Sequence, residues 1–494
     1  MEEVELKFDI ERRDIGRLLR SPALRDAQAE TASLVSIYFD TPDEALAAQQ
    51  MTLRLRRAGE RWEQTLKGGG SVQGGLHARG EWQFESDGSL DLAAFRDTPL
   101  AQMPRAGALH ERLAEIFRVE VERTTWELEP ARGVRMEVAL DDGVVRHRSR
   151  TDAVLEVEIE SKAGPAEALF DLAARLMEHV TLQPSAVTKA ARGYRLVHGW
   201  TPVPVHARAV DLAGVETTWE AACAVLAAGL EQLQANAGGV RISDDPEFVH
   251  QLRVALRRVR SSIRVFRPAL GRALEADVRA ALKAVTRIAG RARDLDVLAL
   301  ETLPALRAAG APATTGSFDV RLASARAEAR EGLRKELRSR RHALALLALT
   351  QALHRRAEDA AGGRKARAFA ARRLRKAHRA LMHATARLDD LGAPGRHALR
   401  IRAKRLRYAL EATGSLFEAK AVRRYTQALS RMQDCLGEVN DAVVAARLLR
   451  ELGAPPRLAT FARGWLEARA EAAFARTSEG LDALRSHRAP WEED

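Results

Sequence analysis

The 494-residue chain has little cysteine, few aromatic residues and no long apolar run. Cys223 and Cys435 are its only cysteines and lie far apart in the sequence, so neither a disulfide framework nor a cysteine zinc site is supported. No segment reaches the ~18 consecutive apolar residues of a membrane-spanning helix, and no apolar signal-peptide core stands at the N-terminus. We therefore expect a soluble, cytoplasmic protein with reduced thiols.

Lysine is also scarce, because arginine supplies 69 of the 79 basic side chains. Residues 1–200 contain 27 basic and 34 acidic side chains, whereas residues 201–494 contain 52 basic and 33 acidic ones. The two parts therefore carry net charges of −7 and +19. This distribution predicts that the C-terminal part attracts polyanions, while the acidic first part is consistent with a metal site.

The chain begins with charges at alternate positions, in Glu3-Val4-Glu5-Leu6-Lys7. On a β-strand these three charged side chains would share one face. Two neighbouring carboxylates can hold a hard divalent cation, and a lysine beside them can hold the phosphate that the cation binds. An ordinary half-buried strand with a solvated outer face has the same pattern. A metal and phosphate site is therefore favoured only if the pattern recurs in other strands.

The alternation recurs along the first two hundred residues. It is seen in Arg54 and Arg56, in Thr65-Leu66-Lys67 before the turn 68–70, in Arg79 with Glu81, in Arg135 with Glu137, and in Glu156, Glu158 and Glu160. Strands of this kind fit an exposed sheet, and they equally fit a closed barrel with a charged lumen. The period of the sequence does not separate these two folds.

The ordered motifs of residues 1–200 resemble those of CYTH domains, the triphosphate tunnel metalloenzymes. The motifs are Glu3 to Lys7, Tyr38-Phe39-Asp40-Thr41, Leu53 to Arg56, Thr65 to Lys67, Arg79 with Glu81, Arg123 to Trp126, Glu137 with Asp141, Glu156 to Glu160, and Arg192-Gly193-Tyr194. The resemblance implies an antiparallel eight-stranded β-barrel tunnel, in which acids hold divalent metal and bases hold a triphosphate.

The implied substrate brings several negative charges into a confined site, so cations must surround it. The residues expected to bind it are Lys7, Arg54, Arg56, Lys67, Arg79, Arg123 and Lys189. Acids in the same tunnel would repel the substrate unless Mg²⁺ or Mn²⁺ stood between them. The expected metal ligands are Glu3, Glu5, Glu156, Glu158 and Glu160, and the residues expected to carry catalysis are Glu3, Glu5, Lys7, Glu158 and Glu160.

The second part of the chain is predicted to be helical and duplicated. A proline-containing linker at 200–205 precedes it, and Ala, Leu, Arg and Glu then follow helical spacing. His250, Arg253, Arg258, Arg260, Gly290 and Asp294 recur 147 positions later as His397, Arg400, Arg405, Arg407, Gly437 and Asp441. A constant offset that includes His, Gly and Asp indicates an internal repeat.

Each copy carries a basic stripe about 100° from an apolar one. The basic stripes are His250, Arg253, Arg257 and Arg260 in the first copy, and His397, Arg400, Lys404 and Arg407 in the second. If the copies pack face to face, the stripes line a groove between helices; a solvated helix face is the alternative. The two histidines are either packed core groups or donors to a bound anion.

Residues 206–490 resemble CHAD domains, through 250–254 with Arg257 and Arg258, through Arg293-Asp294-Leu295-Asp296-Val297, and through 397–400 with Lys404, Arg405 and Arg407. The second copy departs from the pattern, because Asn440-Asp441-Ala442-Val443 has no counterpart of Asp296. The resemblance implies a helical bundle in which the two basic stripes bind inorganic polyphosphate.

Together these observations predict an α+β multidomain protein, with a barrel tunnel at residues 1–200 and an all-α duplicated bundle at 206–490. The expected function is metal-dependent hydrolysis of inorganic triphosphate, with polyphosphate binding and a place at polyphosphate granules. One alternative is a hydrolase or cyclase acting on a thiamine or nucleoside triphosphate. The other is a non-catalytic polyphosphate-binding protein; nucleic acid is disfavoured because the basic part has few aromatic rings for stacking.

Overall fold

The structure, a computed structural model, describes residues 2–103, 109–270, 272–354, 365–386, 388 and 391–492. The chain divides into two compact units. The first comprises Met1–Val203 together with Arg338–Arg355, and the second comprises Pro204–Leu337 and Arg356–Asp494. The division near residue 203 falls inside the predicted linker, but the assignment of 338–355 to the first unit was not expected.

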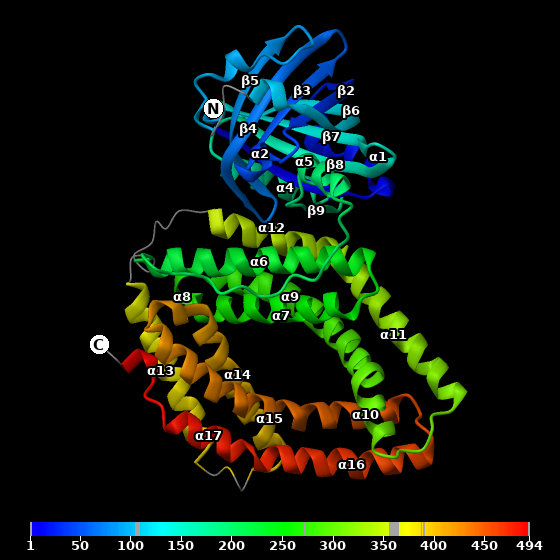
Figure 1. The fold of residues 1–494 in the computed structure, drawn as a ribbon, viewed down its shortest axis with the longest axis vertical. Coiled ribbons are helices and arrows are strands. Elements are labelled where there is room, and N and C mark those ends of the chain that lie inside the picture. The colour runs from blue at the N-terminus through cyan, green and yellow to red at the C-terminus, as the bar shows by residue number, and fades with distance from the viewer. Residues whose placement is uncertain are drawn as a thin grey trace. The chain divides into compact units, whose positions relative to one another are not determined.

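The first unit is built on a closed antiparallel β-barrel, as the CYTH resemblance predicts (Figure 1). Its eight strands are β1 (Glu2–Ile10), β2 (Ala29–Asp40), β3 (Met51–Ala58), β4 (Arg61–Gln73), β5 (Leu76–Ser86), β6 (Ala114–Ala131), β7 (Val134–His147) and β8 (Arg150–Ala163). They follow the order β5-β4-β3-β2-β6-β7-β8-β1, and pairing of β1 with β5 closes the barrel. A short ninth strand, β9 (Leu182–Pro184), pairs with the C-terminal residues Phe8–Ile10 of β1.

The apolar core of this unit lies outside the barrel. Leu6, Phe8 and Ile159 face outward and pack against helix α4 (Glu167–Leu176). Helix α12 (Arg340–His354) adds Ala343 and Leu347 to the same cluster. Because side chains alternate across a strand, the charged residues between these apolar ones must point into the lumen. The closed barrel is therefore the correct choice between the two predicted folds.

Smaller elements complete the first unit. They are α1 (Ile15–Leu19), α2 (Ala45–Ala48), α3 (Leu109–Arg112) and α5 (Lys189–Val197). Thr188 caps the N-terminus of helix α5, because its hydroxyl accepts a hydrogen bond from the backbone N–H of Ala191 at 3.0 Å. The first residue of the helix, Lys189, enters the lumen. Within β4, where its register with β5 shifts between Gly68 and Ser71, Gly70 has a φ of +86°, and a Cβ there would lie 1.9 Å from the carbonyl oxygen of Ala78, so only glycine fits this irregularity.

The second unit is helical. Its helices are α6 (Thr218–Ile242), α7 (Pro246–Val265), α8 (Arg267–Leu270), α9 (Arg272–Val297), α10 (Leu303–Ala308), α11 (Gly316–Leu337), α13 (Ala366–Ala384), α14 (Ala393–Thr413), α15 (Ala419–Glu451), α16 (Pro456–Ala475) and α17 (Thr477–Arg485). A π-helical segment, Leu298–Thr302, joins α9 to α10. Across the described part of the chain, no helix is both long enough and apolar enough to cross a bilayer.

The predicted repeat is visible in the helices. Leu252 and Val259 of α7 are buried, and so are their counterparts Leu399 and Leu406 in α14. The two helices contact one another, as the predicted face-to-face packing requires.

Candidate functional site

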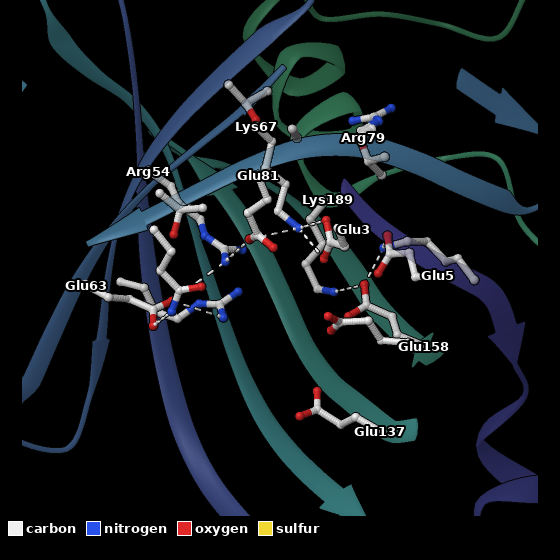
Figure 2. A pocket seen from close by; sticks show the side chains of 18 of the residues that line it. Glu3, Glu5, Arg54, Glu63, Lys67, Arg79, Glu81, Glu137, Glu158 and Lys189 are labelled. Carbon is white, nitrogen blue, oxygen red and sulfur yellow. Dashed lines mark hydrogen bonds and ion pairs between the residues drawn. The ribbon is translucent and has the colours of Figure 1, made fainter. Parts of the chain in front are cut away.

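A cavity of about 280 Å³ occupies the lumen of the barrel, and Figure 2 shows its charged side chains converging from several strands. Every predicted substrate-binding residue lines it, namely Lys7, Arg54, Arg56, Lys67, Arg79, Arg123 and Lys189. Glu3, Glu5, Glu158 and Glu160 line it as well. Glu156 does not: it is fully buried behind Lys7 and Lys189.

One wall of the cavity is acidic because of strand register. Glu5 of β1 lies opposite Glu160 of β8, which in turn lies opposite Glu137 of β7. Like charges in directly opposed positions destabilise a sheet unless a cation joins them. Lys162 Nζ lies 2.8 Å from Glu160 and 3.7 Å from Glu137, and it is only half-buried. Burial, together with repulsion by Glu3 and Glu137, raises the pKa of Glu160 despite this lysine. We call Glu5, Glu160 and Glu137 the acidic row.

A second group of acids lies deeper and is already paired. Ligand oxygens of Asp141, Glu156 and Glu158 lie within 4.8 Å of one another. Lys189 Nζ lies 2.6 Å from Asp141, 2.5 Å from Glu156 and 2.9 Å from Glu158. Lys7 contacts Glu156 at 3.1 Å and also contacts Glu158. Burial alone would lower the pKa of Lys7, but its three glutamate neighbours outweigh burial and raise it. We call Asp141, Glu156 and Glu158 the buried acidic cluster.

Arg123 ties this cluster to β6. Its guanidinium donates two 2.7 Å hydrogen bonds to Asp141, its register partner on β7, and one of 2.6 Å to Glu158. Although burial by itself would raise the pKa of Asp141, Lys189 and Arg123 lower it to about 2. The cluster is therefore a charge-compensated layer that fixes the positions of three cations.

The facing wall is mainly basic. Arg54 and Arg56 of β3 share Glu63 of β4, at 3.7 and 3.5 Å, and Lys67 Nζ lies 2.5 Å from Glu3 and 3.3 Å from Glu81. Burial and the nearby charges of Arg54 and Arg123 lower the pKa of Arg56 to about 10, which indicates a local excess of cations. The side chain of Arg79 has no ion pair or hydrogen bond with the residues that the structure describes.

Two groups of carboxylates could hold a divalent cation, and they differ in how many cationic side chains already contact them. Carboxylates are the ligands that Mg²⁺ and Mn²⁺ prefer. Within the described residues, the ion-pair partners of Glu5 and Glu160 are Lys7, at 3.9 Å, and the half-exposed Lys162. Oxygens of the buried acidic cluster, by contrast, already contact two ammonium groups and a guanidinium. Glu156 could reach a metal only if these cations gave way.

Several lining residues were not among the predicted site residues. Glu63, Glu81, Glu137 and Lys162 line the cavity, and Asp141 supports it from below. Glu81 shares the parity of Arg79, and Glu137 belongs to a recognised motif, so a sequence signal existed for both. Glu63 and Lys162 required knowledge of strand pairing. Among the described residues, Tyr38 is the one aromatic residue in the lining, and Trp82 and Trp126 pack in the outer apolar clusters.

In the second unit, part of each predicted basic stripe converges where α7 meets α14. Arg257 lies over the ring of Tyr408, with 4.9 Å between the guanidinium carbon and the ring centroid. Burial, reinforced by Arg400, Arg257 and Arg253 and opposed by Asp441, lowers the pKa of Lys404 to about 7. We call Arg253, Arg257, Arg400 and Lys404 the basic cluster. Arg253 also pairs with Asp294 at 3.5 Å.

The remaining stripe residues are less closely joined to this cluster. The half-buried His250 is near it, because Arg293, Arg257 and Arg253 add to burial in lowering its pKa. Arg407 instead donates to Glu411 at 2.7 Å. Burial, and after it the charge of Arg279, lowers the pKa of Arg260. His397 is exposed, and no hydrogen bond or ion pair connects it to the described residues.

Comparison with known proteins identifies both parts of the chain. The CYTH domain model matches residues 1–194, and the CHAD domain model matches residues 224–450. An inorganic triphosphatase of Haemophilus influenzae is 32% identical over 166 residues, which are 33% of this chain and 46% of that protein, so this chain spans under half of that relative. An uncharacterized protein of Mycobacterium tuberculosis is 30% identical over 90% of this chain and 87% of its own length.

The helical part also resembles a solved structure. The crystal structure of the CHAD domain from the plant Ricinus communis is 32% identical in sequence, with a TM-score of 0.50. The match covers 59% of this chain and 99% of the plant domain.

Proposed function

Because this chain belongs to the family of proteins that join a CYTH domain to a CHAD domain, we propose that its barrel lumen hydrolyses inorganic triphosphate to phosphate and diphosphate. The observation that carries the proposal is the acidic row facing a basic wall inside the lumen of one closed barrel. The similarity of the CYTH part to an inorganic triphosphatase supports it.

Charge balance explains why such a lumen would need a metal. The lining includes eight cationic and seven acidic residues, so its own charges nearly cancel. A triphosphate adds several negative charges, and divalent cations are the simplest compensation. The acidic row and Glu3 would hold Mg²⁺ or Mn²⁺, which when bound would polarise phosphate oxygens and lower the pKa of a water molecule.

The basic residues would bind and orient the substrate. Arg54, Arg56 and Lys67 can contact its non-bridging oxygens, and the unpaired Arg79 is free to add another contact. Lys7, Lys189 and Arg123 are held by the buried acidic cluster, so they would meet the substrate with little loss of side-chain entropy. Water then attacks the terminal phosphorus in line, the bridging P–O bond breaks, and diphosphate leaves.

Inorganic triphosphate is favoured over an organic one because of the lining. Within the described residues, the lumen offers the single ring of Tyr38 and no apolar pocket for a nucleobase or thiazole. The test is a panel of inorganic, thiamine and nucleoside triphosphates with the full chain and Mn²⁺ or Mg²⁺. We expect the highest kcat/KM for inorganic triphosphate; a higher value for an organic substrate would refute this assignment.

The basic cluster of the helical unit would bind inorganic polyphosphate. Burial is the main cause of the low pKa of Lys404, and the charges of Arg400, Arg257 and Arg253 lower it further. A bound polyanion would offset this repulsion among the cations. This binding would bring the enzyme to polyphosphate granules. Competition between labelled polyphosphate and DNA at fixed salt tests the partner, and equal competition by DNA would contradict the proposal.

A further inference from the structure

A second cationic cavity lies in the helical unit, apart from the basic cluster. It measures about 300 Å³ and is formed by α7, α13 and α14, which Figure 1 labels. Five of its lining residues are cationic: Arg264, Arg373, Lys376, Arg402 and Arg405. No carboxylate lines it within the described part of the chain. Arg402 and Arg405 project from another face of α14 than Arg400 and Lys404, since each residue turns the helix by about 100°.

The internal repeat provides a counterpart for comparison. Buried Thr218, Ala221, Ala222, Leu226 and Leu233 of α6 correspond to buried Ala366, Phe369, Ala370, Leu374 and Leu381 of α13, an offset of 148 positions. Helices α7 and α14 keep the offset of 147 positions. With these offsets, the larger cavity has a small equivalent in the other copy of the repeat. The small cavity is lined by Val225, Arg258, Ser262, Tyr408, Glu411 and Ala412. Its six residues match Arg373, Arg405, Ala409, Ser261, Arg264 and Val265, all of which line the larger cavity.

The counterpart cavity is filled and neutralised. Tyr408 stands where the larger cavity has Ser261, and the remaining volume is about 10 Å³. Glu411 replaces Arg264, so an acid faces the arginine of that site. Val225 replaces Arg373. Lys376 and Arg402 of the larger cavity likewise stand where the other copy has Ala228 and Ala255. These differences separate a closed, charge-balanced position from an open one whose charges are all positive.

The equivalent arginines of the two cavities, Arg258 and Arg405, also differ in whether other side chains hold them. Arg258 donates to the side chain of Gln232 at 3.1 Å and to the carbonyl oxygen of Arg208 at 2.8 Å. The counterpart of Gln232 is Ala380, which has no polar side chain and lines the open cavity. Arg405 forms no hydrogen bond or ion pair with the described residues. One arginine of the pair is built into the fold, and the other is available to a ligand.

We propose that this open cavity binds a phosphate group, either free orthophosphate or the end of a polyphosphate chain. Gathered guanidinium groups match the non-bridging oxygens of phosphate, and a compact oxyanion suits a cavity that lacks aromatic rings for a base. Arg373 is oriented for this role by its hydrogen bond of 2.7 Å to the carbonyl oxygen of Arg264. The orthophosphate alternative is independent of the proposed hydrolysis, whereas the chain-end alternative rests on polyphosphate binding by the same unit.

The test uses the full chain in the presence of a chelator, so that no probe is hydrolysed. Isothermal titration with orthophosphate, and separately with a short polyphosphate, compares the wild type with Ser261→Tyr and with the double variant Arg402→Gln and Arg405→Gln. The tyrosine copies the residue that fills the counterpart cavity and leaves the charge unchanged. A control, Arg423→Gln with Arg424→Gln, removes two exposed charges from α15.

We expect the tyrosine and the glutamine variants each to lose one orthophosphate site, or to bind polyphosphate at least tenfold more weakly, while the control resembles the wild type. Loss with orthophosphate identifies a free phosphate site, and loss with polyphosphate alone identifies a chain-end site. If Ser261→Tyr does not fold, the double variant of the partly buried Arg402 and the exposed Arg405 still tests the site. Unchanged binding of both probes, or an equal loss in the control, would overturn the proposal, whatever the outcome for triphosphate hydrolysis.

Discussion

At the scale of single residues, the arginines of the lumen differ in whether their guanidinium groups are paired with carboxylates. Arg123 compensates Asp141, which is fully buried, whereas Arg79 has no partner among the described residues. We predict that Arg79→Gln lowers kcat/KM for triphosphate about ten- to a hundredfold, the equivalent of one charged hydrogen bond, without changing the melting temperature. Steady-state kinetics and thermal unfolding measure the two effects.

The matched variant is Arg123→Gln, which leaves a buried carboxylate without its guanidinium. We expect its free energy of unfolding to fall by about 3–5 kcal/mol. If Arg79→Gln destabilised the protein as much as Arg123→Gln does, the division between binding and supporting arginines would be wrong.

Lys404 predicts a pH dependence for polyphosphate binding. Its pKa of about 7 is lowered by burial and by Arg400, Arg257 and Arg253, with Asp441 opposing them. A bound polyanion favours the ammonium form, so binding takes up a proton and should strengthen as the pH falls through about 7. Affinity measured from pH 9 to pH 6 at constant ionic strength tests this.

The control for this measurement is Lys404→Arg, which keeps the charge at every pH in the range. Its affinity should vary much less with pH. A wild-type profile retained in the arginine variant would assign the dependence to another group, such as His250.

At the scale of elements, α12 is the least expected part of the tunnel unit. Leu347 lies in the outer apolar cluster, and the hydroxyl of Thr350 donates to the carbonyl oxygen of Gly74 at 3.2 Å. The carbonyl oxygen of the neighbouring Gly75 accepts a hydrogen bond of 2.8 Å from the backbone N–H of Lys7. Helix α12 therefore supports the turn that positions one of the proposed catalytic residues.

We predict that Leu347→Ala lowers the free energy of unfolding of the first unit by about 2–5 kcal/mol, because it leaves a cavity among buried side chains. Gln351→Ala, on the same helix and half-buried, serves as the control. Chemical denaturation measures both. Equal, small effects would show that α12 does not carry part of this core.

The alternation of charged and apolar residues was enough to predict strands on which the charged side chains share one face, and the resemblance to CYTH domains predicted that Glu3, Glu5, Lys7, Arg54 and Arg56 face a lumen. It could not reveal Glu63 or Lys162, whose place in the site depends on which strands pair and in which register. Helix α12 escaped prediction for a similar reason. Its apolar residues look like those of any bundle helix, and only tertiary packing assigns them to the barrel.

At the scale of the whole molecule, the tunnel unit is discontinuous in sequence. A fragment of residues 1–203 lacks Ala343, Leu347 and Thr350, so apolar surface around Phe170, whose ring lies beside that of His354, would be exposed. We predict that this fragment melts at a lower temperature than the same fragment mixed with a peptide of residues 338–355. Thermal unfolding with a scrambled peptide as the control measures this. Equal stabilisation by the scrambled peptide would contradict it.

The repeat also acts at this scale. The two copies share buried positions and basic stripes, yet they differ at Ser261 and Tyr408 and at Arg264 and Glu411, so duplication has given one closed and one open cavity. Under the proposals made above, the chain would bind polyanions at three places: the lumen, the basic cluster and the open cavity.

The most direct test of the central claim is phosphate release from inorganic triphosphate by the full chain. It compares the wild type, the double variant Glu5→Gln with Glu160→Gln, and a control in which the exposed Glu60 and Glu122 become glutamine. We predict metal-dependent release by the wild type and the control, abolished by a chelator, and at least a hundredfold loss in the lumen variant. Absence of release with Mg²⁺ or Mn²⁺, or an undiminished rate in the lumen variant, would contradict the account.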